Sequence, residues 1–211
     1  MEYRQRAEEV RDHMYKFGTC DDEWKVVKST KDVVVSWMPS TDLEGHYMYK
    51  GESQVMAPAE SLFRQVIYPA DISFRASWDN GLSSIETLEE IDKDLRVVRS
   101  CTKSSVMGLI SPRDFVDVVL DTKYDDVLFT AGKSFLYEKC PAVDSHVRGT
   151  NGSTGVMCFK IDGDPNVTRV ISILNVDLGG MLPKTVVESA MPSSLVSFFS
   201  DLKKAAKSLN L

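Results

Sequence analysis

The sequence predicts a single α+β domain in which a strongly curved antiparallel sheet, or partial barrel, packs against a long amphipathic helix at its carboxyl end. Two observations lead to this prediction. From residue 84 to residue 176, β-branched runs alternate with short turns rich in Asp and Gly, which is typical of successive antiparallel strands. After residue 193, the apolar side chains fall within one arc of a helix about 120° wide. Such a helix has to bury that arc against the sheet.

Length and composition limit the class of protein. A chain of 211 residues, 43% hydrophobic and 27% charged, is expected to form one domain, residues 1–211. Its net charge of −6 and its lack of a basic block argue against a nucleic-acid partner. No apolar run approaches the roughly 18–20 residues that span a bilayer, and the charged start does not resemble a signal peptide. We therefore expect a cytoplasmic protein.

The first third of the chain combines a helix with short strands. Apolar residues at steps of three and four predict an amphipathic helix over 3–17, with Gly18 as its stop. Pro58 is expected to open a short helix. Between these helices, β-branched and aromatic runs predict three strands: 24–28, 33–37 and 46–55.

The remaining elements are a series of strands and two helices. The expected strands are 84–91, 95–102, 113–124, 127–137, 147–150, 155–161 and 168–176. A Gly-Gly pair then ends the last strand, Pro183 begins a short helix and Pro192 stops it. Ser193 or Ser194 is expected to cap the long terminal helix.

Candidate catalytic and metal-binding motifs are incomplete. The four cysteines are widely spaced and the three histidines share no metal-ligand spacing, so we expect reduced, structural thiols. The stretch 162–166 imitates an EF-hand loop, but Val167 and Ile173 stand where that loop needs Gly and Glu. The glycine-rich stretch 149–155 lacks the ending of a phosphate-binding loop. These residues point to no enzyme, no metal and no cofactor.

One stretch, 109–117, reads Leu-Ile-Ser-Pro-Arg-Asp-Phe-Val-Asp and resembles the signature of the START family. These are the lipid-transfer domains related to the steroidogenic acute regulatory protein. Three further motifs agree in order: Trp78-Asp79; Val147-Arg148-Gly149-x-Asn151 with Cys158 downstream; and Val176-Asp177-Leu178-Gly179-Gly180-x-Leu182-Pro183. The resemblance covers nearly the whole chain and is strongest to the small cytosolic members that bind sterols or bile acids.

The resemblance implies a helix-grip fold, in which the curved sheet wraps the C-terminal helix around an internal lipid tunnel. It implies a monomeric carrier that holds one sterol-like lipid, contacts membranes transiently and performs no chemical step. Hiding some hundreds of Å² of lipid at ~25 cal/mol per Å² is worth on the order of 10 kcal/mol, comparable to what the lipid gains in a membrane. Two alternatives stay open: a ligand-sensing or adaptor domain without transfer, and a hydrolase or cyclase on the same architecture.

The resemblance also assigns positions in the tunnel. A buried acid–base pair of the steroidogenic member falls on Ser100 and Val119, so that pair is absent here. Losing both partners together is physically coherent, because losing one would strand a buried charge. Arg75 is expected either to contact a polar head or to form a surface ion pair. The expected lipid-binding residues are Arg75, Trp78, Ser100, Val119, Thr130, Asn151, Ser172, Phe198 and Leu202.

The loop 103–112 corresponds to the family's lid over the tunnel mouth. Its centre is apolar where loops are usually polar, which favours contact with a membrane unless Leu109 and Ile110 fold back onto the core. Gly108 is expected to let the loop open, and Arg113 to order it through Asp114. The expected membrane contacts are Met107, Leu109, Ile110, Lys203 and Lys207, although a solvated helix face explains the lysines equally well.

Overall fold

The computed structural model describes residues 2–20 and 23–211. Its helices are α1 (Glu2–Thr19), α2 (Ala59–Leu62), α3 (Arg75–Trp78) and α4 (Lys184–Ser208), with single turns at Phe63–Ile67, Ile72–Phe74 and Val106–Gly108. Its strands are β1 (Lys25–Ser29), β2 (Val34–Pro39), β3 (Tyr47–Val55), β4 (Leu82–Asp92), β5 (Leu95–Thr102), β6 (Arg113–Tyr124), β7 (Val127–Ser134), β8 (Val147–Arg148), β9 (Thr150–Asn151), β10 (Gly155–Ile161) and β11 (Asp164–Asp177). The expected strands are present, with β7 shorter than predicted and the stretch 147–150 divided in two.

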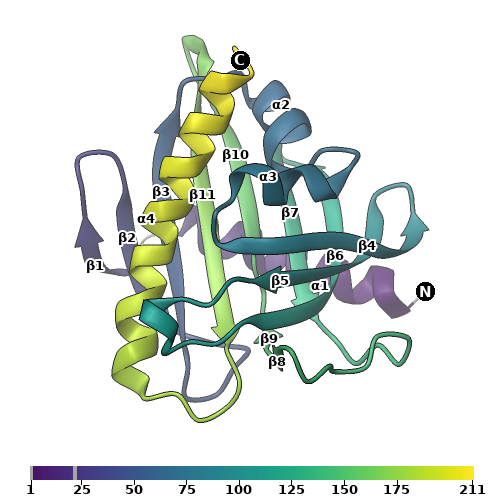
Figure 1. Cartoon of the computed structure of the whole chain (residues 1–211). Helices are drawn as coiled ribbons and strands as arrows, with labels where there is room; N and C mark the ends of the chain where they lie inside the picture. Colours follow the sequence, from purple (N-terminus) through teal and green to yellow (C-terminus); the bar gives the residue numbers. More distant parts are fainter. Residues whose placement is uncertain (1, 21–22) are drawn as a thin grey trace.

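The strands form one sheet of 11 strands in the order β1-β2-β3-β11-β10-β7-β6-β5-β4, with β8 beside β6 and β9 beside β11. Its pairs are antiparallel except for the short pair of β6 with β8. Figure 1 shows α4 lying across one face of the sheet, in front of β3 and β11, with α1 behind the opposite face. The predicted curved sheet with a covering C-terminal helix is therefore confirmed.

The two faces of the sheet carry separate apolar clusters, because successive side chains of a strand point to opposite faces. In β6, Phe115 and Val119 belong to the cluster beneath α4, which we call the inner face. Val118 and Leu120 belong to the cluster beneath α1, which we call the outer face. The position of a residue in its strand thus decides whether its side chain lies toward α4 or toward α1.

The C-terminal helix differs from its prediction. Pro192 does not separate two helices but lies inside the single helix α4, where it is buried. Residues on both sides of it, such as Met191 and Phe199, pack into the inner-face cluster, and this packing outweighs the missing backbone N–H of proline. Ser193 and Ser194 do not cap a helix; their hydroxyls donate to carbonyls one turn earlier, at 3.2 and 3.0 Å.

Two glycines mark where helices approach the sheet most closely. Gly18 does not end α1 but lies buried within it, and a Cβ there would stand 2.4 Å from Sδ of Met157 on the outer face. On the inner face, a Cβ at Gly51 of β3 would stand 2.8 Å from Cε2 of Phe199. The prediction that Gly18 stops the helix was wrong because close packing, and not a turn, requires the glycine.

The C-terminal half of α4 is hydrogen-bonded to the residues just before β4. The carboxylate of Asp201, buried in α4, accepts hydrogen bonds from the side-chain amide of Asn80 at 3.0 Å and from its backbone N–H at 3.3 Å. Within the described residues, no helix is long and apolar enough to cross a membrane.

Candidate functional site

A pocket of about 240 Å³ opens where the N-terminal half of α4 crosses the ends of β3 and β11. Tyr47 and Tyr49 from β3, Val176 from β11, and Val187 and Met191 from α4 contribute to its lining. Ligand pockets for drug-sized molecules usually have roughly 300–1,000 Å³. Its walls therefore have to separate before it admits a molecule of that size.

Four of the expected lipid-binding residues come together beside α4. Phe198 and Leu202 project from α4 into the inner-face cluster, where Trp78 and Val119 pack against it. The rings of Trp78 and Phe198 lie 5.8 Å apart between centroids, and the Trp78 indole N–H donates to the Val66 carbonyl at 3.1 Å. These residues form an apolar wall separate from the pocket, since none of them is among the residues that line it.

Arg75 lies at the edge of this wall. Its guanidinium carbon stands 5.8 Å from the ring centroid of Trp78 and 5.4 Å from that of Phe198. The same group forms an ion pair with Asp79 at 3.3 Å. The guanidinium thus faces the aromatic wall and is paired with a neighbouring acid, while its contact with a polar head stays a prediction.

Three further predicted residues lie on the inner face by strand alternation. Thr130 stands between two outer-face residues of β7, and its hydroxyl accepts a hydrogen bond from Val156 N–H at 3.2 Å. Ser172 stands between two outer-face isoleucines of β11 and is buried. Ser100 of β5 is paired directly with inner-face Phe115 of β6. Each puts a small hydroxyl on a largely apolar surface.

Asn151 leads to a residue that the sequence analysis missed. Its side-chain amide donates to Oδ2 of Asp117 at 2.8 Å, while the hydroxyl of Ser134 donates to Oδ1 at 2.6 Å. Asp117 lies on the inner face between Phe115 and Val119. Burial raises its pKa to about 6, against the opposing effect of these two hydrogen bonds. The sequence did carry one signal for Asp117. In a strand, a residue shares its face with the residues two positions before and after it, here the apolar Phe115 and Val119.

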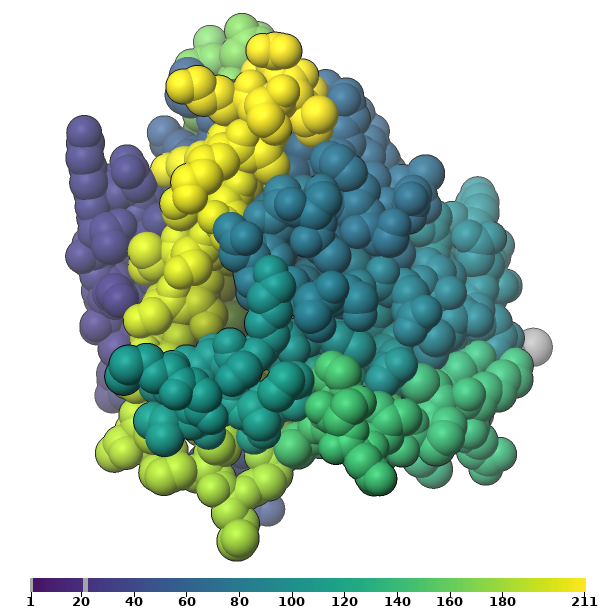
Figure 2. All heavy atoms as spheres, in the orientation of Figure 1, coloured from purple at the N-terminus to yellow at the C-terminus, as the bar shows by residue number. Residues whose placement is uncertain are grey.

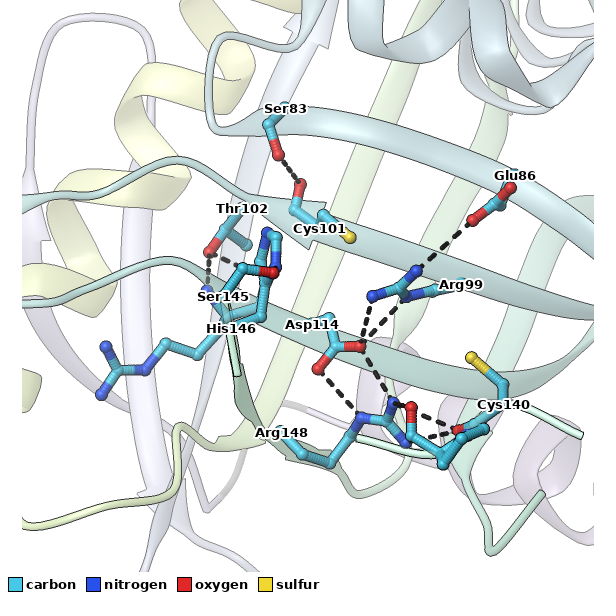
Figure 3. Close-up of polar contacts among 12 residues, drawn as sticks. Ser83, Glu86, Arg99, Cys101, Thr102, Asp114, Cys140, Ser145, His146 and Arg148 are labelled. Carbon is cyan, nitrogen blue, oxygen red and sulfur yellow. Dashed lines mark hydrogen bonds and ion pairs between the residues drawn. The ribbon is translucent and has the colours of Figure 1, made fainter. Parts of the chain in front are cut away.

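Asp114, three residues earlier, lies on the outer face and is fully buried. Figure 3 shows two guanidinium groups converging on its carboxylate, Arg99 from β5 and Arg148 from β8. Arg99 donates at 3.0 Å, and Arg148 donates to both oxygens at 2.9 Å. Burial alone would raise the pKa of Asp114, but these bonds hold that pKa below its ordinary value. Three strands are thereby joined around one carboxylate.

Arg113 orders its loop, but through other partners than Asp114. Its buried guanidinium donates to the hydroxyl of Ser111 at 2.7 Å and to that residue's carbonyl, and to the carbonyl of Leu178 at 3.1 Å. Burial lowers its pKa from the usual value. Arg113 therefore connects the base of loop 103–112 with the segment that leads from β11 into α4.

These two connected segments carry the most exposed apolar side chains near α4. In loop 103–112, Met107 is 100% and Leu109 is 64% exposed, whereas Ile110 is buried at 4%. Met181, in the other segment, is also fully exposed. Figure 2 shows loop 103–112 against the first part of α4 and the segment before it. The expected surface contact of Ile110 is thus not available in this conformation, because Ile110 folds back onto the core while Leu109 does not.

The expected lysines are remote from this loop. Figure 1 places the turn Val106–Gly108 beside the N-terminal half of α4, whereas Lys203 and Lys207 belong to its last turns. The structure therefore does not gather these lysines beside the apolar tips.

Comparison with known proteins identifies the family. The model of the START domain matches residues 4–210. The chain belongs to the START domain family. The StAR-related lipid transfer protein 5 of Bos taurus is 35% identical over 204 residues, which cover 96% of this chain and 95% of that protein. The structure of human StAR-related lipid transfer protein 5 matches with a TM-score of 0.93 and 32% identity, covering 100% of this chain and 99% of that one.

The START fold is also found at much lower sequence similarity. The Zhui aromatase/cyclase from a Streptomyces species matches with a TM-score of 0.54 at 14% identity and covers 76% of this chain. That likeness concerns the fold alone. Both the TM-score and the sequence identity are much higher for StAR-related lipid transfer protein 5 than for the cyclase.

Proposed function

We propose that this START domain holds one sterol-like lipid on the inner face beneath α4 and carries it between membranes without a chemical step. The observation that carries the proposal is the apolar wall beneath α4 together with the fully exposed apolar tips beside the helix. We propose a cytoplasmic monomer that contacts membranes transiently. The lipid-binding residues proposed are Arg75, Trp78, Ser100, Val119, Thr130, Asn151, Ser172, Phe198 and Leu202.

The route to the inner face is proposed to run through the pocket of about 240 Å³. Its walls belong to α4 and to the ends of β3 and β11, and loop 103–112 lies beside the same half of α4. That loop holds Val106 at φ 51° and Met107 at φ 53°, which side chains other than glycine rarely adopt. Such backbone is costly unless its surroundings hold it, so displacement of the loop relieves strain. Opening of loop and helix would widen the pocket.

The proposal is tested by transfer of a fluorescent sterol between liposomes with the purified protein. Saturable binding of one lipid per chain and protein-dependent transfer are expected. Absence of both binding and transfer for sterol, bile acid, carotenoid and phospholipid would overturn the proposal. Binding without exchange would instead identify a ligand-sensing domain.

Replacing Leu109 by Asp is expected to slow transfer about tenfold or more while leaving lipid affinity nearly unchanged. A leucine side chain moved from water into an apolar environment gains about 1.5–3 kcal/mol, and every 1.4 kcal/mol is a factor of ten. Transfer rates and equilibrium binding are measured on the same preparation. Leu136→Asp is the matched control, since Leu136 is 89% exposed but lies between β7 and β8. Equal losses of transfer and affinity in Leu109→Asp would contradict the role of this tip.

An enzyme remains the second candidate because of one contact at the pocket. Nε2 of His46 lies 3.4 Å from Oδ1 of Asp177, and both residues line the pocket. The other ring nitrogen, Nδ1, lies 2.9 Å from the carbonyl oxygen of Glu44, so the imidazole would act as a general base only after one of these two contacts is released. Mass spectrometry of lipid recovered after incubation decides between the two candidates: unchanged lipid supports the carrier, and a changed mass supports the enzyme.

A further inference from the structure

The buried carboxyl of Asp117 has surroundings unlike those of the other acids in the sheet. Its direct partner on β5 is Val98, and its inner-face neighbours on β6 are Phe115 and Val119. Its polar contacts come from the uncharged Ser134 of β7 and Asn151 of β9. A carboxyl group has thus been placed in an apolar wall with neutral donors alone within hydrogen-bond distance.

Within the described part of the chain, no cation forms an ion pair with this carboxyl. Arg148 acts on it through space, but directs its guanidinium to Asp114 on the other face. Asp121, on the same face of β6, differs in this respect, because it forms an ion pair with Arg64. Burial of an unpaired carboxyl is costly, as the pKa of about 6 for Asp117 reflects.

The carboxylate still has capacity to accept hydrogen bonds. Two carboxylate oxygens offer about four acceptor positions, and Ser134 and Asn151 fill one on each oxygen. A further donor would spread the buried charge and lower its cost. An anionic group in the same place would add a second negative charge in a medium of low dielectric constant. The chemistry of this site therefore accepts a hydroxyl and rejects a carboxylate or phosphate.

We infer that Asp117, held by Ser134 and Asn151, is a specificity determinant that accepts a hydrogen bond from the hydroxyl group of a lipid alcohol bound on the inner face. The inference rests on the proposed carrier function. In this arrangement the ligand lies with its hydroxyl end at Asp117 and with any anionic end away from Asp117. Val98, Phe115 and Val119 would surround the apolar carbon atoms next to that hydroxyl.

Two sterols that differ in one functional group test the inference. Cholestan-3β-ol carries a hydroxyl where cholestan-3-one carries a ketone, which accepts but cannot donate. Both are measured in competition with a fluorescent sterol at pH 7.4. The wild-type protein is expected to bind the alcohol about ten times or more tightly than the ketone, since a hydrogen bond to a charged group is at stake. In Asp117→Asn the preference is expected to fall to near unity, because an amide also donates to a ketone.

The matched control is Asp121→Asn, which changes an acid on the same strand and face that already has Arg64 as partner. It is expected to keep the wild-type preference. A second measurement needs no variant: the preference of the wild-type protein is expected to vanish as the pH falls through about 6, where Asp117 gains a proton and becomes a donor. Val98, Ser134 and Asn151, which face Asp117 from β5, β7 and β9, do not titrate, and Arg148 stays cationic.

The outcomes separate the inference from the function on which it rests. Equal binding of alcohol and ketone by the wild-type protein, or an unchanged preference in Asp117→Asn, overturns the inference and leaves the carrier function standing. Binding of phospholipid but of neither sterol also overturns it. Failure to bind or transfer lipid of any tested class overturns the proposed function itself.

Discussion

Replacing Asp114 by alanine is expected to lower the free energy of unfolding by about 3–5 kcal/mol. The change leaves Arg99 and Arg148 without the fully buried carboxylate that both bond. The two guanidiniums, each partly screened from water, then repel each other across the junction of β5, β6 and β8. Because the carboxylate that joins these three strands is lost, we expect a large decrease in the free energy of unfolding.

Urea denaturation at pH 7 measures this loss. Glu86→Ala is the control, since Glu86 reaches Arg99 at 3.8 Å but is 56% exposed, and exposed pairs contribute about 0–1 kcal/mol. A loss below about 1 kcal/mol for Asp114→Ala would contradict the role assigned to this carboxylate. Since the pKa of Asp114 is lowered in the folded protein, its contribution is complete at neutral pH. It is lost in acid, as the pH falls through that lowered pKa.

Replacing Asp117 by asparagine is expected to stabilise the protein at pH 7.4 by up to about 3 kcal/mol. The pKa of Asp117 is raised from its ordinary value of 3.8 to about 6. A shift of about two units corresponds to about 3 kcal/mol between the two protonation states. The amide oxygen of the variant can still accept from Asn151, and its NH2 can donate to the Ser134 oxygen once that hydroxyl turns, so both contacts are kept without the buried charge. A carboxyl that destabilises the fold in this way is typical of a functional position.

The pH dependence of this gain follows from the direction of the shift. Between about pH 4 and pH 6, the folded protein holds a proton on Asp117 that the unfolded chain has released, so the wild-type stability falls as the pH rises through this window. The advantage of Asp117→Asn should therefore grow from pH 4 to pH 6 and stay constant above. Subtracting the unfolding free energy of the wild type from that of the variant at each pH removes the contributions of the other acids, which are common to both proteins. A variant that is less stable than the wild type at pH 7.4 would contradict the assignment.

The strands and their order along the chain were predictable, because turns and β-branched runs are local signals. The course of α4 was not. Pro192 is locally a helix breaker, and only the packing of both halves of the helix on a sheet built from distant residues explains why the helix continues. Leu109 and Ile110 show the same limit: they are neighbours of equal hydrophobicity, yet one is 64% exposed and the other 4%.

Asp114 and Asp117 of β6 show which features of the site could not be predicted from the sequence. Asp114 and Asp117 stand three residues apart, so alternation predicts that they face opposite sides of the sheet. It does not tell which one receives two arginines, because Arg99 and Arg148 come from other strands. The unpaired state of Asp117 thus depended on the pairing register of β5, β6 and β8, which no local pattern records.

The proline inside α4 has a mechanical consequence. Because Pro192 cannot donate a backbone hydrogen bond, we expect α4 to bend more easily there than elsewhere along its length. The half of α4 before Pro192 borders the pocket, whereas the half after it is held by Phe199 against Gly51 and by Asp201 against Asn80. A bend at Pro192 would therefore move the first half away from the inner face while the second half stays packed on the sheet.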